Sequence, residues 1–265
     1  MKGRILPAIL IVGLMSLCCL LGPVPRLLFL LLCALAAVYE VWALLCPGDG
    51  PVYLGLVEGY VLLSALIGLH GSALSLLALT MGTAQILLAV AAFTYRPGHG
   101  REALRGLALL VYPGCFFGAI LFISQLEHWL WPFAAGVLTA WVCDSAALVA
   151  GTYFGKHPLN TPVSPRKTWE GVGAGLAAAV PVGLICWAFF GRACGLSVFT
   201  WIFVCLLLSA WGQVGDLAAS LVKRALGVKD FSHLLGPHGG IMDKFDSMVY
   251  AILLAYLLLH GLGAI

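Results

Sequence analysis

The sequence predicts an all-α, polytopic integral membrane protein, a helical bundle with about nine transmembrane helices. Composition is the first reason. Hydrophobic residues make up 62% of the 265 residues and charged residues only 9%, whereas soluble domains are about half apolar and about a quarter charged. The second reason is that the apolar residues gather into runs close to the ~20 residues that a bilayer-spanning helix needs. These runs are residues 5–22, 27–45, 52–69, 73–93, 106–124, 130–149, 171–190, 197–215 and 248–264.

Lys and Arg residues divide unequally between the two faces of this arrangement. Of the fourteen, only Arg26 and Arg192 fall on the face opposite the N-terminus. The positive-inside rule therefore predicts that the N-terminus and the polar loops lie in the cytoplasm and the C-terminus outside. We expect an integral, multi-pass protein of a bacterial-type inner membrane. The net charge of +3 gives no reason to expect nucleic acid as a partner. The lipid bilayer is the expected surrounding, and a homodimer is left open.

The runs before residue 140 contain few polar residues and are separated by Pro- and Gly-rich turns such as GPVPR and CPGDGP. We therefore divide the chain into N-terminal scaffold helices, 1–139, and a catalytic half, 140–265, within one continuous membrane domain. Glu40 and Glu58 are acids inside apolar runs. We interpret both as carboxyls that face the bundle and are neutral or paired with a neighbour.

Polar residues accumulate from the sixth run onward. Asp144 and Ser145 interrupt that run, and the segment SPRKTWEG follows at 164–171. Ser164 is expected to cap a helix that begins at Pro165. Arg166 and Lys167 would then strengthen an anion site at the helix N-terminus. The alternative is an ordinary capped helix with basic residues at its start.

The eighth run is followed by charged residues at helical spacing. If its helix continues, Asp216, Ser220 and Lys223 lie on one stripe, with Arg224 beside it. A carboxylate, a hydroxyl and a cation on one face could hold a metal ion and the phosphate that it neutralises. The alternative is a helix end whose charged side chains only reach water.

Two further aspartates, Asp243 and Asp246, are three residues apart and would face the same way on a helix. Carboxylates at this spacing can bind Mg²⁺ with substrate phosphates completing the oxygen shell. The Gly239-Gly240 step just before them lets backbone N–H groups approach a phosphate. The alternative is a flexible loop capped by acids.

The run from Ser220 to Asp246, SLVKRALGVKDFSHLLGPHGGIMDKFD, resembles the signature of the phosphatidate cytidylyltransferases, also called CDP-diacylglycerol synthases. The segment from Ser164 to Gly171 and the acid Asp144 match the same family. One position departs from the pattern, because the family usually has Arg where this chain has Lys244. A lysine keeps the charge but not the bidentate geometry of arginine.

The resemblance implies transfer of a cytidylyl group from CTP to phosphatidate, forming CDP-diacylglycerol and pyrophosphate with Mg²⁺ as cofactor. Asp216, Asp243 and Asp246 would bind the metal. The residues expected to be catalytic are Asp216, Lys223, Arg224, Asp243 and Asp246. The residues expected to bind substrate are Asp144, Ser164, Arg166, Lys167, Ser220, Lys229, Asp230, His238, Gly239, Gly240 and Lys244.

Two other functions fit part of the pattern. A related cytidylyltransferase that uses another lipid phosphate, such as an ether lipid, would keep nearly all of these residues. A transporter or channel could also place polar groups between helices, but it would distribute charge through the membrane depth. Here the charges gather on one face.

Overall fold

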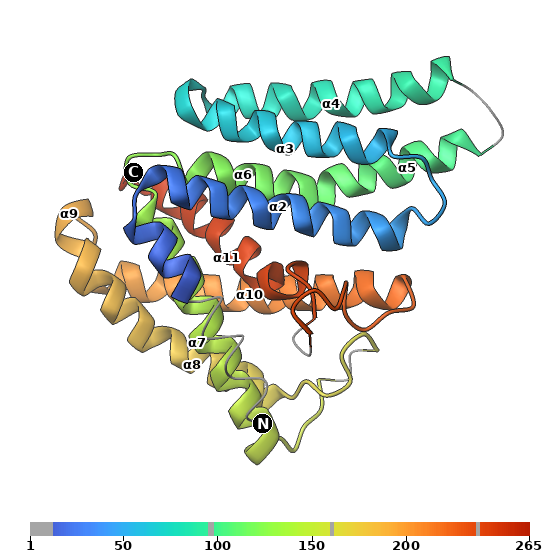
Figure 1. Cartoon of the computed structure of the whole chain (residues 1–265). Coiled ribbons are helices and arrows are strands. Elements are labelled where there is room, and N and C mark those ends of the chain that lie inside the picture. Colours follow the sequence, from blue (N-terminus) through green and yellow to red (C-terminus); the bar gives the residue numbers. More distant parts are fainter. Residues whose placement is uncertain (1–12, 95–97, 160–161, 237–238) are drawn as a thin grey trace. The chain divides into compact units, whose positions relative to one another are not determined.

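The computed structural model describes residues 13–94, 98–159, 162–236 and 239–265 (Figure 1). These residues form helices joined by short loops, and their only β-type pairing is an isolated bridge between Pro158 and Thr168. Two compact units divide the chain. One contains Met1–Glu127 with Asp230–Asp243, and the other contains His128–Lys229 with Lys244–Ile265.

The helices of the first unit pack around α3, which contacts α2, α4 and α6. Its core includes Val57 and Tyr60 of α3 and Phe117 and Ile120 of α6, all almost fully buried. The elements of this unit are α2 (Pro23–Leu45), α3 (Val52–His70), α4 (Ala73–Phe93), α5 (His99–Leu109), the π-helix η1 (Leu110–Cys115) and α6 (Phe116–Ile123).

The predicted run 106–124 is therefore not one regular helix. Pro113 lies in η1, and Tyr112 before it has non-helical dihedral angles of φ −137° and ψ 109°. Proline lacks the N–H that a helix interior needs and its ring clashes with the preceding turn, which accounts for the break between α5 and α6.

In the second unit α8 packs against both α7 and α10, which also contact each other. Trp201 of α10 is fully buried in the core of this unit, together with Cys143, Val182 and Leu208. The elements are α7 (Leu130–Phe154), α8 (Trp169–Cys186), the π-helix η2 (Trp187–Gly191), α9 (Arg192–Cys194), α10 (Val198–Ala225) and α11 (Met242–Gly261), whose first two residues belong to the first unit.

In the part of the chain that the structure describes, seven helical segments are long and apolar enough to cross a membrane. They match seven of the predicted runs, so the prediction of an all-α, polytopic membrane bundle is confirmed. Of the first predicted run only residues 13–22 lie in the described part of the chain, and residues 13–20 are helical. The last run falls in α11, which is outside the seven and carries Asp243, Lys244 and Asp246 near its start.

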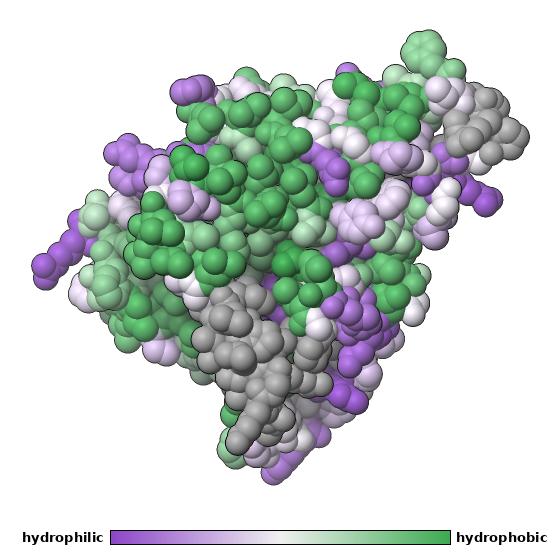
Figure 2. Space-filling view, viewed as in Figure 1, coloured by the Kyte–Doolittle hydropathy of each residue, from purple (hydrophilic) through white to green (hydrophobic). Residues whose placement is uncertain are grey.

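The surface agrees with this assignment. Hydrophobic residues cover much of the face shown in Figure 2. Leu32 of α2, Leu74 of α4 and Phe203 of α10 are among the large apolar side chains that are more than half exposed. Such continuous apolar exposure would be a liability in water, but it suits contact with lipid. The chain is a multi-pass membrane protein.

The two compact units are defined by which residues pack together, and residues 230–243 belong to the same unit as the helices before residue 128. The division at 139/140 predicted from the sequence separates scaffold from chemistry instead. It stays a prediction, because packing does not report which residues react.

Glycines allow two helices of the second unit to approach closely. A Cβ atom added at Gly136 of α7 would lie 2.7 Å from the Cα of Ile252 in α11, whereas one added at Gly173 of α8 would meet nothing within 4 Å. Backbone atoms cannot move aside as a side-chain end can, so a side chain at Gly136 would force the helices apart.

We therefore expect Gly136→Ala to lower the free energy of unfolding by about 1–3 kcal/mol, the usual range for overpacking. Thermal unfolding of the purified protein in detergent would measure this as a lower melting temperature. Gly173→Ala is the matched control, and its melting temperature should be unchanged or higher because alanine favours the helix. Equal melting temperatures for the wild type and Gly136→Ala would contradict the close approach.

Candidate active site

Three helices of the second unit contribute carboxylates to one place. Asp144 of α7, Asp216 of α10 and Asp246 of α11 lie close enough to interact electrostatically, and we call them the acidic cluster. The hydroxyl of Ser247 donates a hydrogen bond of 2.7 Å to Asp144 Oδ2. Asp144 does not interrupt its helix, since α7 continues to Phe154. The structure thus brings Asp216 and Asp246 close to Asp144, although both lie about 70 or more residues further along the chain.

Two lysines balance the acidic cluster. Lys167 Nζ lies 2.7 Å from Asp216 Oδ2, and Lys223 Nζ lies 3.9 Å from Asp246 Oδ2. Because α10 runs without interruption to Ala225, Asp216, Ser220 and Lys223 stand on one helical stripe, as predicted. Asp216 therefore has a close basic partner, and Asp246 has a more distant one.

Asp246 is the most perturbed member of the cluster. Only 14% of its side chain is exposed, and it precedes the apolar run 248–264. Burial is the main cause that raises the pKa of Asp246, the nearby Asp216 carboxylate adds to the shift and Lys223 opposes it, so that the net pKa is about 7. A raised pKa means that the ionised form lacks sufficient positive charge nearby. An additional cation at this place would stabilise the ionised carboxylate.

Helix α11 reaches α10 at glycine positions. A Cβ atom added at Gly215 would lie 2.7 Å from the ring of Tyr250 and 2.9 Å from the carbonyl oxygen of Asp246. Gly215 directly precedes Asp216, so the absence of its side chain lets the two helices bring Asp216 and Asp246 together. In the Gly215-Asp216 pair, the glycine thus allows close helix packing and the aspartate supplies the carboxylate.

The segment before α8 differs from its prediction. Helix α8 begins at Trp169, and its cap is Thr168, whose Oγ1 accepts a hydrogen bond of 3.2 Å from Gly171 N–H. The prediction that Ser164 caps a helix beginning at Pro165 is wrong. Ser164 instead accepts from the N–H of Lys167 in a turn. Ser164 precedes Pro165, and a residue before a proline disfavours helical geometry. In addition, Leu159 N–H donates a hydrogen bond to the Lys167 carbonyl, so Lys167 is paired with another segment.

In the first unit, we call the described residues 230–236 and 239–243 the signature loop. Asp243 Oδ2 accepts hydrogen bonds from the N–H groups of Phe231 (2.8 Å) and Gly240 (2.9 Å). Gly239 has φ +81°, a left-handed conformation that favours glycine. Both N–H groups of the Gly-Gly step are used inside the loop, since Gly239 N–H donates to Gly236. Their predicted binding to phosphate stays a prediction that requires these bonds to be exchanged.

Other predicted site residues lie near the ends of helices. Arg224 is exposed and donates from Nη1 to the Val228 carbonyl at 3.0 Å, at the C-terminal end of α10. Gly227 there has φ +71°, as in a helix C-cap. Of the remaining predicted residues, Arg166 and Lys229 are exposed, and Ser220, Asp230 and Lys244 are half-buried; His238 lies outside the described residues.

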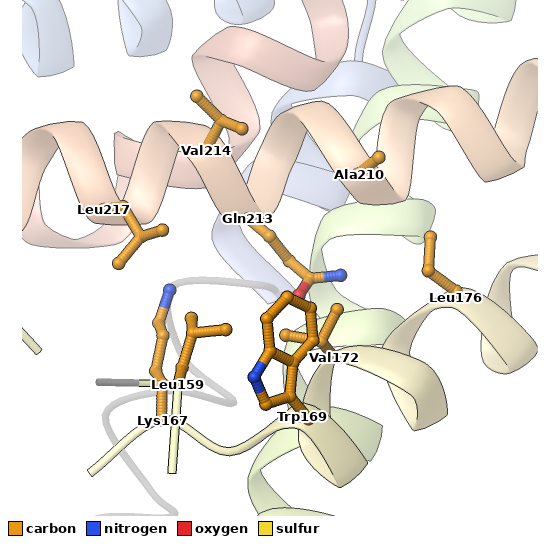
Figure 3. Close-up of a pocket in the computed structure, with 9 residues that line it drawn as sticks. All are labelled: Leu159, Lys167, Trp169, Val172, Leu176, Ala210, Gln213, Val214 and Leu217. Carbon is orange, nitrogen blue, oxygen red and sulfur yellow. The ribbon is translucent and has the colours of Figure 1, made fainter. Parts of the chain in front are cut away.

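A cavity of about 210 Å³ lies next to Lys167, between α8 and α10 (Figure 3). Its polar side chains are Lys167 and Gln213, and the Lys167 ammonium group points towards α10. Gln213 Nε2 is buried and has no hydrogen-bond partner among the described residues. The cavity's apolar walls are Leu159, Trp169, Val172, Leu176, Ala210, Val214 and Leu217.

Sequence reasoning missed part of this arrangement. Glu40 accepts hydrogen bonds from Ser232, Ile241 and Met242 of the signature loop. The prediction of a bundle-facing carboxyl with a neighbour is confirmed for Glu40, but the neighbour was unknown. An acid in an apolar run was the available signal. Gln213 had no comparable signal, since one amide in a long apolar helix is unremarkable in sequence.

Comparison with known proteins gives the context of these residues. The model of the cytidylyltransferase family matches residues 2–262, nearly the whole chain. The chain belongs to the cytidylyltransferase family. Its relatives include three proteins named phosphatidate cytidylyltransferase. The protein of Staphylococcus saprophyticus is 38% identical to this chain over 122 residues. That of Staphylococcus haemolyticus is 39% identical over 124 residues, and that of Staphylococcus aureus strain COL is 40% identical over 124 residues.

These alignments cover 46% of this chain and 46% of each relative, so the chain matches about half the length of these curated relatives. Membership of the cytidylyltransferase family therefore rests on the match to the family model, which spans both compact units.

Proposed function

We propose that this cytidylyltransferase-family protein is a phosphatidate cytidylyltransferase, transferring a cytidylyl group from CTP to phosphatidate. The observation that carries the proposal is the acidic cluster with its two lysines, built on three helices of a membrane protein. The names of the Staphylococcus relatives support the same activity. Both substrates are anionic, and one is held in the bilayer, so the reaction needs cations at a membrane surface.

The chemistry fits these residues. A phosphate oxygen of phosphatidate attacks the α-phosphorus of CTP, the bond from that phosphorus to the oxygen bridging to the β-phosphate breaks, and pyrophosphate leaves. The second pKa of a phosphate monoester is about 6, so the nucleophile is already largely ionised at neutral pH and needs no strong base. Lys167 and Lys223 would reduce the repulsion between the two polyanions. No covalent intermediate with the protein is needed.

Mg²⁺ is the cofactor proposed for this chemistry. Among the described residues, no three acid, imidazole or thiol side chains form a ready-made metal site. Magnesium in phosphoryl-transfer enzymes is often held by only one or two carboxylates, with substrate phosphates and water as the other ligands. Asp216 and Asp246 fit that mode, and the raised pKa of Asp246 fits a buried carboxylate that Lys223 compensates only in part. Bound there with CTP, Mg²⁺ would neutralise the triphosphate and stabilise the leaving pyrophosphate.

Asp243 remains a proposed metal ligand, and it also stabilises the signature loop. Its Oδ2 already accepts two backbone hydrogen bonds in the signature loop. Replacing Asp243 would therefore disturb the loop as well as any metal. Asp246 is the cleaner position for testing the role of a carboxylate.

The cavity beside Lys167 supports a lipid as the acceptor. It has apolar walls and one cation, the combination that suits an acyl chain next to an anionic headgroup. At about 210 Å³ it is smaller than the roughly 300–1,000 Å³ of sites that hold a whole small molecule. It would take the part of one chain nearest the phosphate, while the rest of the lipid stays in the bilayer.

The distribution of Lys and Arg supports one orientation of the protein in the membrane. With twelve of the fourteen Lys and Arg residues on one face, the N-terminus and the acidic cluster would face the cytoplasm, where CTP is found. A transporter remains the alternative from another class. An ether-lipid phosphate as the acceptor is the alternative within the family, and the assay below separates all three.

The first prediction from the proposed function concerns activity. Purified protein with CTP, Mg²⁺ and phosphatidate should form CDP-diacylglycerol and pyrophosphate, and Asp246→Asn should reduce the rate by about a hundredfold or more, as for loss of a strong transition-state contact. Asparagine keeps the shape of the side chain but removes its charge. Chromatography of the labelled lipid product measures the rate.

Glu127→Gln is the control, since Glu127 is an exposed acid in the loop between α6 and α7. Normal turnover by Asp246→Asn would remove that carboxylate from the mechanism. Product formation only with an ether-lipid phosphate would favour the related enzyme, and no product with any lipid phosphate would contradict the proposed activity.

A second prediction concerns the lipid. Val172→Trp should fill the cavity beside Lys167 and raise the KM for phosphatidate about tenfold, equivalent to about 1.4 kcal/mol of binding, with the KM for CTP unchanged. Steady-state kinetics in mixed micelles measures both constants. Val180→Trp is matched, because Val180 lies on the same helix outside the cavity. Equal phosphatidate KM values for the two variants would exclude the cavity as a lipid site.

The third prediction concerns topology. In a background without native cysteines, Gly100→Cys and Ser164→Cys should resist an impermeant thiol reagent in intact cells and react after permeabilisation, whereas Ala264→Cys should react in both. The reason is the one-sided distribution of Lys and Arg. Mass-shift labelling on gels measures accessibility. Reaction of the Ser164→Cys variant in intact cells would reverse the proposed orientation.

A further inference from the structure

Glu40 is a buried acid with an unusually complete set of donors. It lies within α2, an otherwise apolar helix, and only 5% of it is exposed. Its Oε1 accepts from Ser232 Oγ at 2.7 Å and from Ile241 N–H at 2.9 Å, and its Oε2 accepts from Met242 N–H at 2.9 Å. An ionised carboxylate is costly to bury unless such bonds replace its water. The contacts explain how α2 tolerates this acid.

All three donors come from the signature loop, about 190 or more residues further along the chain. Ser232 lies near the beginning of the loop, while Ile241 and Met242 lie at its end. Met242 is the first residue of α11. The first N–H groups of a helix have no partner inside it and carry partial positive charge, so a carboxylate there acts as a cap. Glu40 therefore supplies a cap to α11 from the helix α2.

Asp243 completes the arrangement from inside the loop. Through Oδ2 it holds Phe231 N–H and Gly240 N–H. Glu40 and Asp243 together therefore hold both ends of the loop, each by more than one hydrogen bond. Phe231, 2% exposed, also packs against the ring of Tyr112. The loop is anchored to the first unit by these contacts.

The Gly-Gly step fits between the two carboxylates. A Cβ atom added at Gly240 would lie 2.6 Å from the Glu40 carboxyl carbon, and one added at Gly239 would lie 2.7 Å from Asp243 Oδ2. Real Cβ atoms do not approach this closely. Close packing against carboxylates thus requires glycine at both positions, independently of any phosphate.

We infer that Glu40 is a positioning residue: it holds the signature loop and the start of α11 in place through Ser232, Ile241 and Met242, without touching the substrates. The activity readout below rests on the proposed function, whereas the exchange readout does not. The inference extends the functional part of the chain into α2, which the sequence places among scaffold helices.

The test compares two Glu→Gln variants of the full-length protein. Glu40→Gln removes the charge and replaces one acceptor by a donor that faces backbone N–H groups. Glu58→Gln is the matched control, since Glu58 is a half-buried acid in the apolar helix α3. Hydrogen exchange read by mass spectrometry should show faster exchange over peptide 231–243 in Glu40→Gln, by about tenfold or more, and no change there in Glu58→Gln.

Kinetics give the second readout. Glu40→Gln should lower kcat by about 10- to 100-fold, as expected when reacting groups are displaced by about an ångström. The melting temperature should remain high enough for the assay. Ser232→Ala removes one of the three hydrogen bonds, so it should show a smaller effect on kcat and exchange. The double variant should lose less than the product of the two single losses, because both act on one contact network.

Unchanged exchange over 231–243 in Glu40→Gln would overturn the inference, whether or not activity falls. Equal effects of Glu40→Gln and Glu58→Gln would also overturn it, because they would indicate a general cost of altering an acid in this unit. If Glu40→Gln fails to fold, the Ser232→Ala variant decides by the same exchange measurement. If the wild type forms no CDP-diacylglycerol, the proposed function fails and the exchange comparison still tests Glu40.

Discussion

A charge surrounded by apolar groups must be compensated where it stands, and the polar part of this chain follows from that constraint. Glu40 is compensated by three donors, and Asp216 by Lys167 at 2.7 Å. Asp246 is compensated less fully, with Lys223 at 3.9 Å and a raised pKa. The acid with the weakest compensation stands where the proposed reaction would bring further cations. In the proposed mechanism, incomplete pairing distinguishes Asp246 from the structural acid Glu40.

Close helix packing is the second requirement, and glycine satisfies it. At Gly136 and Gly215 the neighbouring helix is too near for any side chain. These positions let α11 lie against α7 and α10, and the acids on the three helices come together as a result. At Gly240 the same principle applies to a carboxylate rather than a helix. A family signature rich in glycine and aspartate can therefore reflect packing and charge compensation at once.

The two roles of a carboxylate, holding backbone and holding a cation, are distributed over neighbouring residues of one helix. Asp243 at the start of α11 accepts hydrogen bonds from Phe231 and Gly240 of the signature loop, whereas Asp246 faces lysine and other carboxylates. Sequence alone treats them as an equivalent pair three residues apart. Their surroundings make them different, and a substitution at one should not be interpreted in the same way as a substitution at the other.

What the sequence by itself determined is local. Apolar runs of bilayer length predicted the seven described helical segments that are long and apolar enough to cross a membrane, because each backbone group in lipid must be satisfied within its own segment. Helical spacing placed Asp216, Ser220 and Lys223 on one stripe, and the break at Pro113 could have been read from the same run. The polar motifs identified the family that the family model also matches.

Only the tertiary structure decided which groups meet. Glu40 contacts Met242, Lys167 pairs with Asp216, and Thr168 rather than Ser164 caps α8. The first two contacts join different helices or loops, and periodicity within one segment carries no information about the face of another. The third depends on the pairing of Leu159 with Lys167, which delays the start of the helix beyond the local signal. Local rules act through neighbouring residues, whereas compensation of buried charge depends on whatever group the fold brings within hydrogen-bond distance.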